Sequence, residues 1–380
     1  MTGPSRWTVL VSVAATAAGC ASAPKDAGFA DVRRTVVEHT DQPIEWDPSV
    51  PVRPADDAAL APLLEEELTA EGAVRIAFAN NRDVQATLEE LGIARAELLA
   101  AGTIRNPLFH VETRFPGRPS TPVEMGIAQT LVDLFQLKNR KRLGRAQFEA
   151  TRIQVGGAVV HFAAQVRARY FDLLAARRIL ARQETIRKAQ EAATELALRQ
   201  HAAGNISDLD LENEQSRYEQ VKLDHARAQL DELEARERVI ADLGLVQRVE
   251  LKLPDDFPPP EALAATPEDV EARAVAERLD LRVARREIEA AQQALPLARS
   301  SAFDELALGV HYEKEPDGSR TTGPELEVPI PIFDRGGAQK ARAYSLLRQA
   351  QQRFVALTVA ARSEARSALE RLRTALARMV

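Results

Sequence analysis

Helical and alternating patterns of apolar residues follow one another along this chain in an order that occurs twice. Residues 68–260 contain a helical pattern, an alternating pattern over 108–135 and a long helical pattern over 138–244. Residues 261–380 begin the same series again, with a helical pattern, an alternating pattern over 305–333 and an incomplete long helix. A repeat of this length indicates that one structural unit was duplicated.

The alternating segments predict two pairs of β-strands. In the first pair, Phe109, Val111 and Phe115 alternate with polar residues. Each run has about the ~9–11 residues that a tilted transmembrane strand needs. A half-buried sheet in a soluble protein would alternate in the same way, so the pattern alone leaves both interpretations open.

The longest helical segment predicts an antiparallel hairpin. No proline occurs from Lys138 to about His201, which predicts a helix of roughly 95 Å at ~1.5 Å per residue. Ala203-Gly204-Asn205 ends this helix, and Ser207 or Asp208 can cap a returning helix that runs to Gly244. The first arm carries apolar residues close to a heptad seam, namely Val155, Val159, Phe162, Val166, Tyr170 and Leu173.

Residues 1–20 resemble a lipoprotein signal peptide. Arg6 precedes a short apolar run that cannot span a bilayer as a permanent helix, which needs ~20 residues. The single cysteine, Cys20, stands at the end of this run, so we expect it to be lipidated and held at the outer membrane. A plain secreted protein with an incidental cysteine is the alternative. Residues 21–67 contain several prolines and are interpreted as a linker from the lipid anchor.

Composition narrows the class of protein. Aromatic residues make up 5% of the chain, and its richness in Ala, Leu, Arg, Glu and Gln is typical of long helices. The net charge of −6 argues against a nucleic-acid partner, whose phosphates favour a basic face. The six histidines lack the spacing of a metal motif, and no nucleophile or nucleotide-binding motif occurs. We therefore expect no metal, no cofactor and no enzymatic activity.

The order of the elements resembles the TolC-type outer-membrane factors of tripartite efflux pumps and type I secretion systems. The residues that carry the resemblance are Asn80-Asn81-Arg82-Asp83 and its echo at Arg278-Leu279-Asp280-Leu281, Asn106-Pro107 before a strand, Pro329 to Gly337 before a long helix, and the hairpin tip from Ala203 to Asp210. Asp280 of the echo follows Asp83 by 197 residues. The signal resembles that of the lipoprotein branch of this family. The segment from Phe135 to Arg142 resembles the heavy-metal (CzcC-like) members most.

This resemblance implies a mainly α-helical protein with a small membrane β part, assembled as a homotrimer in the outer membrane. Each chain would contribute four strands to a twelve-stranded β-barrel, and its long antiparallel coiled-coil helices would form a tunnel across the periplasm. Physical reasoning agrees, because four strands cannot close a barrel and an open sheet edge cannot lie in lipid. The channel would be a passive conduit that works with a periplasmic adaptor and an inner-membrane pump.

In that architecture each strand has a lipid side and a lumen side. The residues expected to face lipid are Phe109, Val111, Phe115, Leu306, Leu308 and Val310. The residues expected to line the lumen are Glu112, Arg114, Glu124, Glu305, Glu325 and Glu327. The resemblance also implies that the hairpin tip docks the adaptor, through Gly204, Asn205, Ile206, Asp208 and Leu209. A glycine that merely ends a helix explains Gly204 as well.

The second repeat departs from the family pattern. Its long helix starts near Gly337 and the chain ends at Val380, so we expect a C-terminally truncated member whose second hairpin is incomplete. The alternative to a channel subunit is a periplasmic coiled-coil adaptor or structural protein of an efflux system, with a soluble sheet. Nothing in the sequence identifies the cargo. Metal ions, drugs and peptides are all compatible with the residues expected to line the lumen.

Overall fold

The chain forms two compact units. The computed structural model describes residues 26–48, 66–113, 122–247, 249–258, 265–315 and 317–378. The first unit comprises Met1–Phe29, Glu90–Val155 and Ala264–Val380, and the second comprises Ala30–Glu89 and Gly156–Leu263. The expected signal and Cys20 lie outside the described residues. No helix in the described part of the chain is both long and apolar enough to cross a bilayer.

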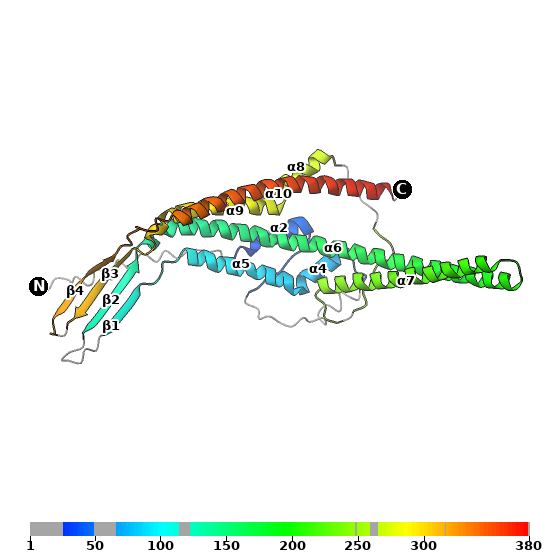
Figure 1. Ribbon diagram of the computed structural model, residues 1–380, viewed down its shortest axis with the longest axis horizontal. Coiled ribbons are helices and arrows are strands. Elements are labelled where there is room, and N and C mark those ends of the chain that lie inside the picture. Colours follow the sequence, from blue (N-terminus) through cyan, green and yellow to red (C-terminus); the bar gives the residue numbers. More distant parts are fainter. Residues whose placement is uncertain are drawn as a thin grey trace. The chain divides into compact units, whose positions relative to one another are not determined.

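The second unit is helical, and its longest elements form the expected hairpin. Most of α6 (Val132–Ala202) lies in this unit and runs antiparallel to α7 (Asp208–Asp242) (Figure 1). Polar contacts join the two arms: the Gln190 side chain donates a hydrogen bond to Glu214 at 3.0 Å, and the His225 ring lies 3.1 Å from the Glu184 carboxylate. The apolar seam predicted on α6 is buried, apart from the half-buried Phe162; its buried members are Val155, Val159, Val166, Tyr170 and Leu173.

Part of the segment interpreted as a linker is a helix. Residues Phe29–Thr40 form α2, and its Val32 and Val36 are 1% and 0% exposed because they share one face of the helix. The helix ends at Thr40, whose hydroxyl donates to the Val36 carbonyl at 2.7 Å. Arg167 of α6 donates to the Thr40 carbonyl at 2.8 Å. The linker interpretation was therefore wrong for this stretch, because the chain has no proline between Pro24 and Pro43 to interrupt a helix.

The first helical pattern of residues 68–260, which precedes the first strand pair, forms two helices with a break at Asn81. Helix α4 (Ala70–Asn80) ends where Asn81 adopts an extended backbone with φ −68° and ψ 122°. The Asn81 side-chain oxygen then accepts hydrogen bonds from the first turn of α5 (Arg82–Ala101), at 2.9 Å from the Asp83 N–H. In the second repeat, Arg278 has the same backbone (φ −58°, ψ 125°) between α8 (Pro267–Glu277) and α9 (Leu279–Ser300). The two similar sequence segments, around Asn81 and around Arg278, therefore correspond to the same break between two helices.

The first unit contains an antiparallel sheet with the strand order β1-β2-β3-β4 (Figure 1). Its strands are β1 (Leu108–Thr113), β2 (Val123–Thr130), β3 (Ala307–Lys314) and β4 (Arg320–Glu327). Each repeat supplies one hairpin, and the two hairpins pair through β2 and β3. The fold class predicted from the sequence, long helices with two strand pairs, is confirmed.

Both strand pairs end earlier than the alternation predicted. The first was expected to reach residue 135, but α6 already begins at Val132. The second was expected to reach residue 333, but β4 ends at Glu327. Pro329 and Pro331 explain this second difference, because a proline has no N–H to donate to the ladder.

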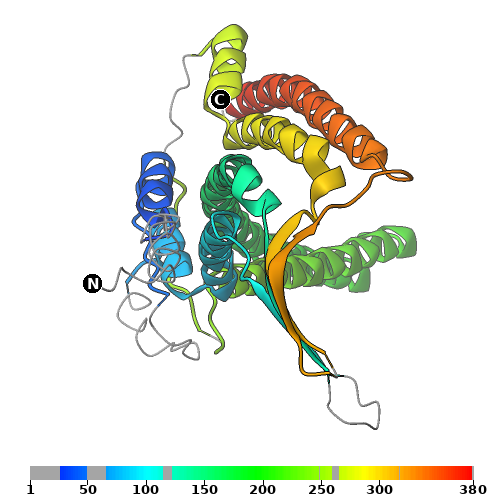
Figure 2. The same ribbon diagram turned by 90° about the vertical axis from the view of Figure 1, so that its left-hand side faces the viewer.

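Helices α8, α9 and α10 (Gly337–Ala377) complete the first unit. In both views α10 runs beside α9, against which it packs (Figures 1 and 2). Two ion pairs connect α10 to the segment before it, Arg278–Glu364 at 2.5 Å and Arg366–Glu271 at 2.9 Å. The apolar residues of α10 are only partly used in this packing: Leu369 is buried, whereas Val355 and Val359 are 57% and 64% exposed.

Candidate channel-forming surfaces

The strand register places polar side chains on one face of the sheet. His110 lies opposite Gly126, which lies opposite His311, and Glu112 and Glu124 are partners in the neighbouring row. Because side chains alternate between faces along a strand, residues in register share a face. The polar face therefore carries His110, Glu112, Glu124, His311, Glu313, Glu325 and Glu327.

The opposite face is apolar and exposed. Phe109, Ile127 and Val310 occupy one row across three strands and are 68%, 48% and 51% exposed. Other exposed apolar residues on this face are Val111, Leu308 and Leu326. Apolar side chains left in contact with solvent on one face of a sheet indicate that lipid or another protein covers that face.

Four of the residues expected to line a lumen, Glu112, Glu124, Glu325 and Glu327, share the polar face. Glu305 lies in the turn before β3, so its expected place on a strand was wrong, and Leu306 likewise precedes the strand. The strand begins two residues later because the 3₁₀ turn Ser301–Phe303 and the bend after it extend the connection from α9. Arg114 and Phe115 lie outside the described residues.

The sheet has two open edges. β1 and β4 are its outer strands, and among the described residues no further strand pairs with either of them. Unpaired backbone N–H and C=O groups on such an edge can pair with a strand of another chain. The backbone groups of these edges therefore form hydrogen bonds either with strands of other chains or with water.

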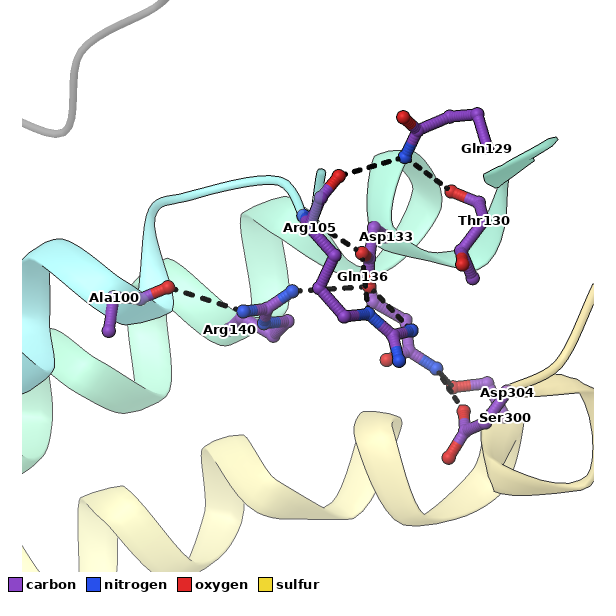
Figure 3. Close-up of polar contacts among 9 residues, drawn as sticks. All are labelled: Ala100, Arg105, Gln129, Thr130, Asp133, Gln136, Arg140, Ser300 and Asp304. Carbon is purple, nitrogen blue, oxygen red and sulfur yellow. Dashed lines mark hydrogen bonds and ion pairs between the residues drawn. The ribbon is translucent and has the colours of Figure 1, made fainter. Parts of the chain in front are cut away.

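A buried carboxylate at the start of α6, that of Asp133, forms hydrogen bonds with the segment that precedes β1 (Figure 3). The Asp133 side chain is 3% exposed and accepts hydrogen bonds from Arg105, at 2.8 Å from Nε and 3.0 Å from Nη2. The Arg105 backbone N–H also donates to it at 3.2 Å, as does Arg140 Nη1 at 3.2 Å. The hydrogen bonds from Arg105, with the nearby charge of Arg140, hold the pKa of Asp133 below its ordinary value.

The same cluster reaches the second repeat. Gln136, one turn after Asp133, donates to the Ser300 hydroxyl at 2.8 Å and to Asp304 at 3.0 Å (Figure 3). Gln129 at the end of β2 donates to the Arg105 carbonyl at 3.1 Å. These contacts link the segment before β1, the end of β2 and the connection between α9 and β3. They therefore fix the two β-hairpins relative to each other at this end of the sheet.

The hairpin tip is a tight helical turn. Gly204 has φ 74°, a left-handed conformation that favours glycine, and its N–H donates to the His201 carbonyl at 2.8 Å. The cap of α7 is Ser207: its hydroxyl accepts from the Asp210 N–H at 3.2 Å, while Asp210 accepts from the Ser207 N–H at 3.3 Å. The sequence had left Ser207 and Asp208 as alternatives for this role.

Asp208 and Leu209 remain on the surface of the tip. The Asp208 carboxylate lies across the turn from His201, with 2.6 Å between Oδ1 and Nε2, which is within hydrogen-bond distance. Leu209 is 69% exposed, although it stands next to a well-formed cap.

A cluster that sequence reasoning did not find lies on the polar face of the sheet. His110, Glu124 and His311 offer ligand atoms that all lie within 4.8 Å of one another. No metal motif marks these residues in the sequence, because they come from three strands in two repeats. Only the strand register brings them together.

The long helical hairpin and the two-faced, four-stranded sheet form a fold that solved structures of outer-membrane channels also have. The family model of the outer membrane efflux protein matches residues 73–245 of the chain. No curated protein matches the sequence.

Solved structures of outer-membrane channels share this fold. The structure of CusC, described with conformational changes that accompany folding and transmembrane channel formation, matches with a TM-score of 0.64, 19% identity, and 89% of this chain and 83% of that chain covered. The outer-membrane channel OprN matches with a TM-score of 0.64 and 18% identity, over 89% and 85%. The open state of MtrE from Neisseria gonorrhoeae matches with a TM-score of 0.58 and 18% identity, over 81% and 72%. The family model and the shared fold confirm the resemblance to TolC-type channels.

Proposed function

We propose that this chain is the channel subunit of an efflux system, a passive conduit through the outer membrane that catalyses no reaction. The two faces of the sheet carry this proposal. One face exposes Phe109 and Val310 while the other carries only uncharged or acidic residues and two histidines among its described strand positions. A surface that is apolar outside and polar inside is the arrangement of a transmembrane barrel strand.

The open edges of β1 and β4 support assembly from several copies. In lipid, every backbone N–H and C=O needs a partner, so an isolated four-stranded sheet cannot insert. Because known membrane barrels have at least ~8 strands, one copy is too few. We propose a homotrimer with twelve strands, the arrangement that the family resemblance implies. The exposed apolar residues of α10, among them Val355 and Val359, would then pack against a neighbouring protomer.

In this assembly Glu112, Glu124, Glu325 and Glu327 line the lumen, and the hairpin of α6 and α7 belongs to the periplasmic tunnel. Lipidation of Cys20 would add an anchor in the same membrane. The channel would act with an inner-membrane pump and a periplasmic adaptor, because a passive conduit does not itself drive transport. The cargo is left open.

Cysteine substitutions on adjacent strand residues test the orientation of the sheet. We expect Glu112→Cys and Glu327→Cys to react with a membrane-impermeant maleimide in intact outer membranes. Val111→Cys and Leu326→Cys should react at least ~10-fold more slowly, because a thiol in lipid keeps its proton. The wild-type chain, whose one cysteine is Cys20, measures the background.

Equal labelling of all four positions would contradict the channel and favour a soluble sheet. Detergent extracts of the same samples, in which lipid no longer shields the apolar face, provide the control for thiol reactivity. Chemical cross-linking of the purified protein then counts the copies. A trimer is expected, and a monomer that labels on both faces would exclude the proposal.

We further propose that the hairpin tip is the contact for the adaptor. A photo-crosslinking amino acid at Leu209, which is 69% exposed at the tip, should give one discrete adduct in cells. The same amino acid at Leu230, which is 54% exposed in the middle of α7, should give none. Mass spectrometry of the adduct would identify the partner, and adducts of equal yield from both positions would contradict docking through the tip.

A further inference from the structure

Two histidines and two glycines occupy one row across the four strands of the sheet. His110 of β1 faces Gly126 of β2, which faces His311 of β3, which faces Gly323 of β4. Neighbouring strands lie ~4.8 Å apart, so the two histidines are separated by the one position that has no side chain. This gap allows both imidazoles to approach the same point above β2.

The space over Gly126 is filled by the His110 ring. A Cβ atom at position 126 would lie 2.2 Å from His110 Cε1 and 2.7 Å from Nε2, so any larger residue would push the imidazole away. Gly323, at the other end of the row, has no atom within 4 Å of the equivalent position. The His110 imidazole therefore leans across β2 towards the third strand.

Glu124 completes a set of three donor groups. Its Oε1 lies 3.7 Å from His311 Nδ1, and the ligand atoms of His110, Glu124 and His311 all lie within 4.8 Å of one another. Around a zinc ion with bonds of ~2.0–2.1 Å, the ligand atoms are roughly 3.4 Å apart. The side chains of His311 and Glu124 are 26% and 28% exposed, so they have room to rotate. Small rotations can therefore shorten the present separations of up to 4.8 Å between ligand atoms to the roughly 3.4 Å that zinc requires.

The surroundings favour a cation. Glu313 lies 3.6 Å from His311 Nε2, and Glu112 is the strand partner of Glu124. Among the described strand residues on this face none is a lysine or an arginine. A row of carboxylates beside two imidazoles lowers the electrostatic potential where a positive ion would sit.

We propose that His110, His311 and Glu124 form a binding site for a divalent transition-metal ion. Two imidazole nitrogens and one carboxylate oxygen suit zinc, copper and nickel, whereas calcium and magnesium prefer oxygen ligands alone. Water would fill the remaining coordination positions, which leaves the ion exchangeable. The site goes beyond the proposed conduit, and its position in a lumen rests on that proposal, whereas ion binding itself does not.

Calorimetry with zinc chloride tests the site on the full chain, purified in detergent with a tag that contains no histidine and first treated with a chelator. We expect one zinc ion per chain. His110→Gln and His311→Gln should each weaken binding by at least about tenfold, since even the loss of outer-shell partners costs 10–100-fold. His161→Gln, which changes an exposed histidine of α6, should leave the affinity unchanged.

A pair of glycine substitutions tests the geometry without removing a ligand. Gly126→Ala should displace the His110 ring and weaken zinc binding by about tenfold or more, as displaced ligands do. Gly323→Ala is the matched control in the same row, and it should bind zinc like the wild type. Circular dichroism and the oligomeric state of each variant establish that the sheet is intact.

Three results would overturn the site. They are no zinc binding by the wild type, equal binding by the variant that lacks both histidines, and equal competition by calcium, which would indicate a diffuse acidic surface. Each result is independent of the cysteine-labelling experiment. Zinc binding together with labelling of both faces would retain the metal site and exclude the channel, and the reverse combination would exclude the metal site alone.

Discussion

Replacing Asp133 by alanine is expected to lower the free energy of unfolding by about 2–4 kcal/mol. The carboxylate is 3% exposed and accepts hydrogen bonds from Arg105 and Arg140. Arg105 is 58% exposed, so its charge can regain water, which keeps the loss below that of a fully buried pair. Urea unfolding of the purified protein in detergent, at a fixed protein concentration and followed by circular dichroism, measures the difference.

The pH dependence gives a second readout of the same carboxylate. Its pKa is lowered in the folded protein, so the stabilisation is present above the ordinary carboxyl pKa and is lost as the pH falls through the folded value. The difference in unfolding free energy between the wild type and Asp133→Asn should therefore shrink below about pH 4, the region of an unperturbed aspartate. A difference that stays constant down to pH 2 would exclude the charge as its cause.

An exposed ion pair provides the control for this substitution. Glu195 pairs with Arg199 one turn along α6, with side chains 63% and 74% exposed. Glu195→Ala should change the unfolding free energy by at most about 0.5 kcal/mol. If Asp133→Ala cost no more than this control, the Asp133 cluster would not hold the strands, and the position of the sheet would depend on packing alone.

The sequence could predict the helices and strands because each has a strong local pattern. The seam from Val155 to Leu173 keeps three- and four-residue steps, and those residues are buried apart from Phe162. The alternation around Phe109 and Val310 correctly separated the two faces of the sheet. Such periodicity reports which side of an element is apolar and needs no knowledge of distant contacts.

The features that were missed depend on contacts between distant residues. The break at Asn81 is held by hydrogen bonds of the Asn80 and Asn81 side chains to carbonyls at the end of α7, about which a local pattern carries no information. The approach of His110 to His311 likewise requires the pairing of β2 with β3. Cross-strand register is set by the fold as a whole, so a one-residue change would have placed these histidines elsewhere.

Replacing Gly244 by alanine is expected to destabilise the second unit by about 3–4 kcal/mol, from strain, overlap and lost hydrogen bonds together. Gly244 has φ 69°, and a Cβ there would lie 2.9 Å from the Asn80 carbonyl oxygen and 3.0 Å from the Asn81 Cα. Both atoms belong to the backbone, so neither can rotate away. Their displacement would also break the hydrogen bonds from the Asn80 amide to the Leu243 and Gly244 carbonyls, at 3.1 and 2.7 Å.

Gly204→Ala separates backbone strain from this overlap. Gly204 has nearly the same conformation, φ 74°, but no atom lies within 4 Å of its missing Cβ. Its substitution should therefore cost only the left-handed strain, about 1–2 kcal/mol. The two variants are compared by urea unfolding under the same conditions as Asp133→Ala. If both cost the same, the close approach of Gly244 to Asn80 would contribute nothing to stability. If Gly244→Ala costs more by about 2 kcal/mol, the excess measures the free energy of the close contact between Asn80 and the backbone at the end of α7.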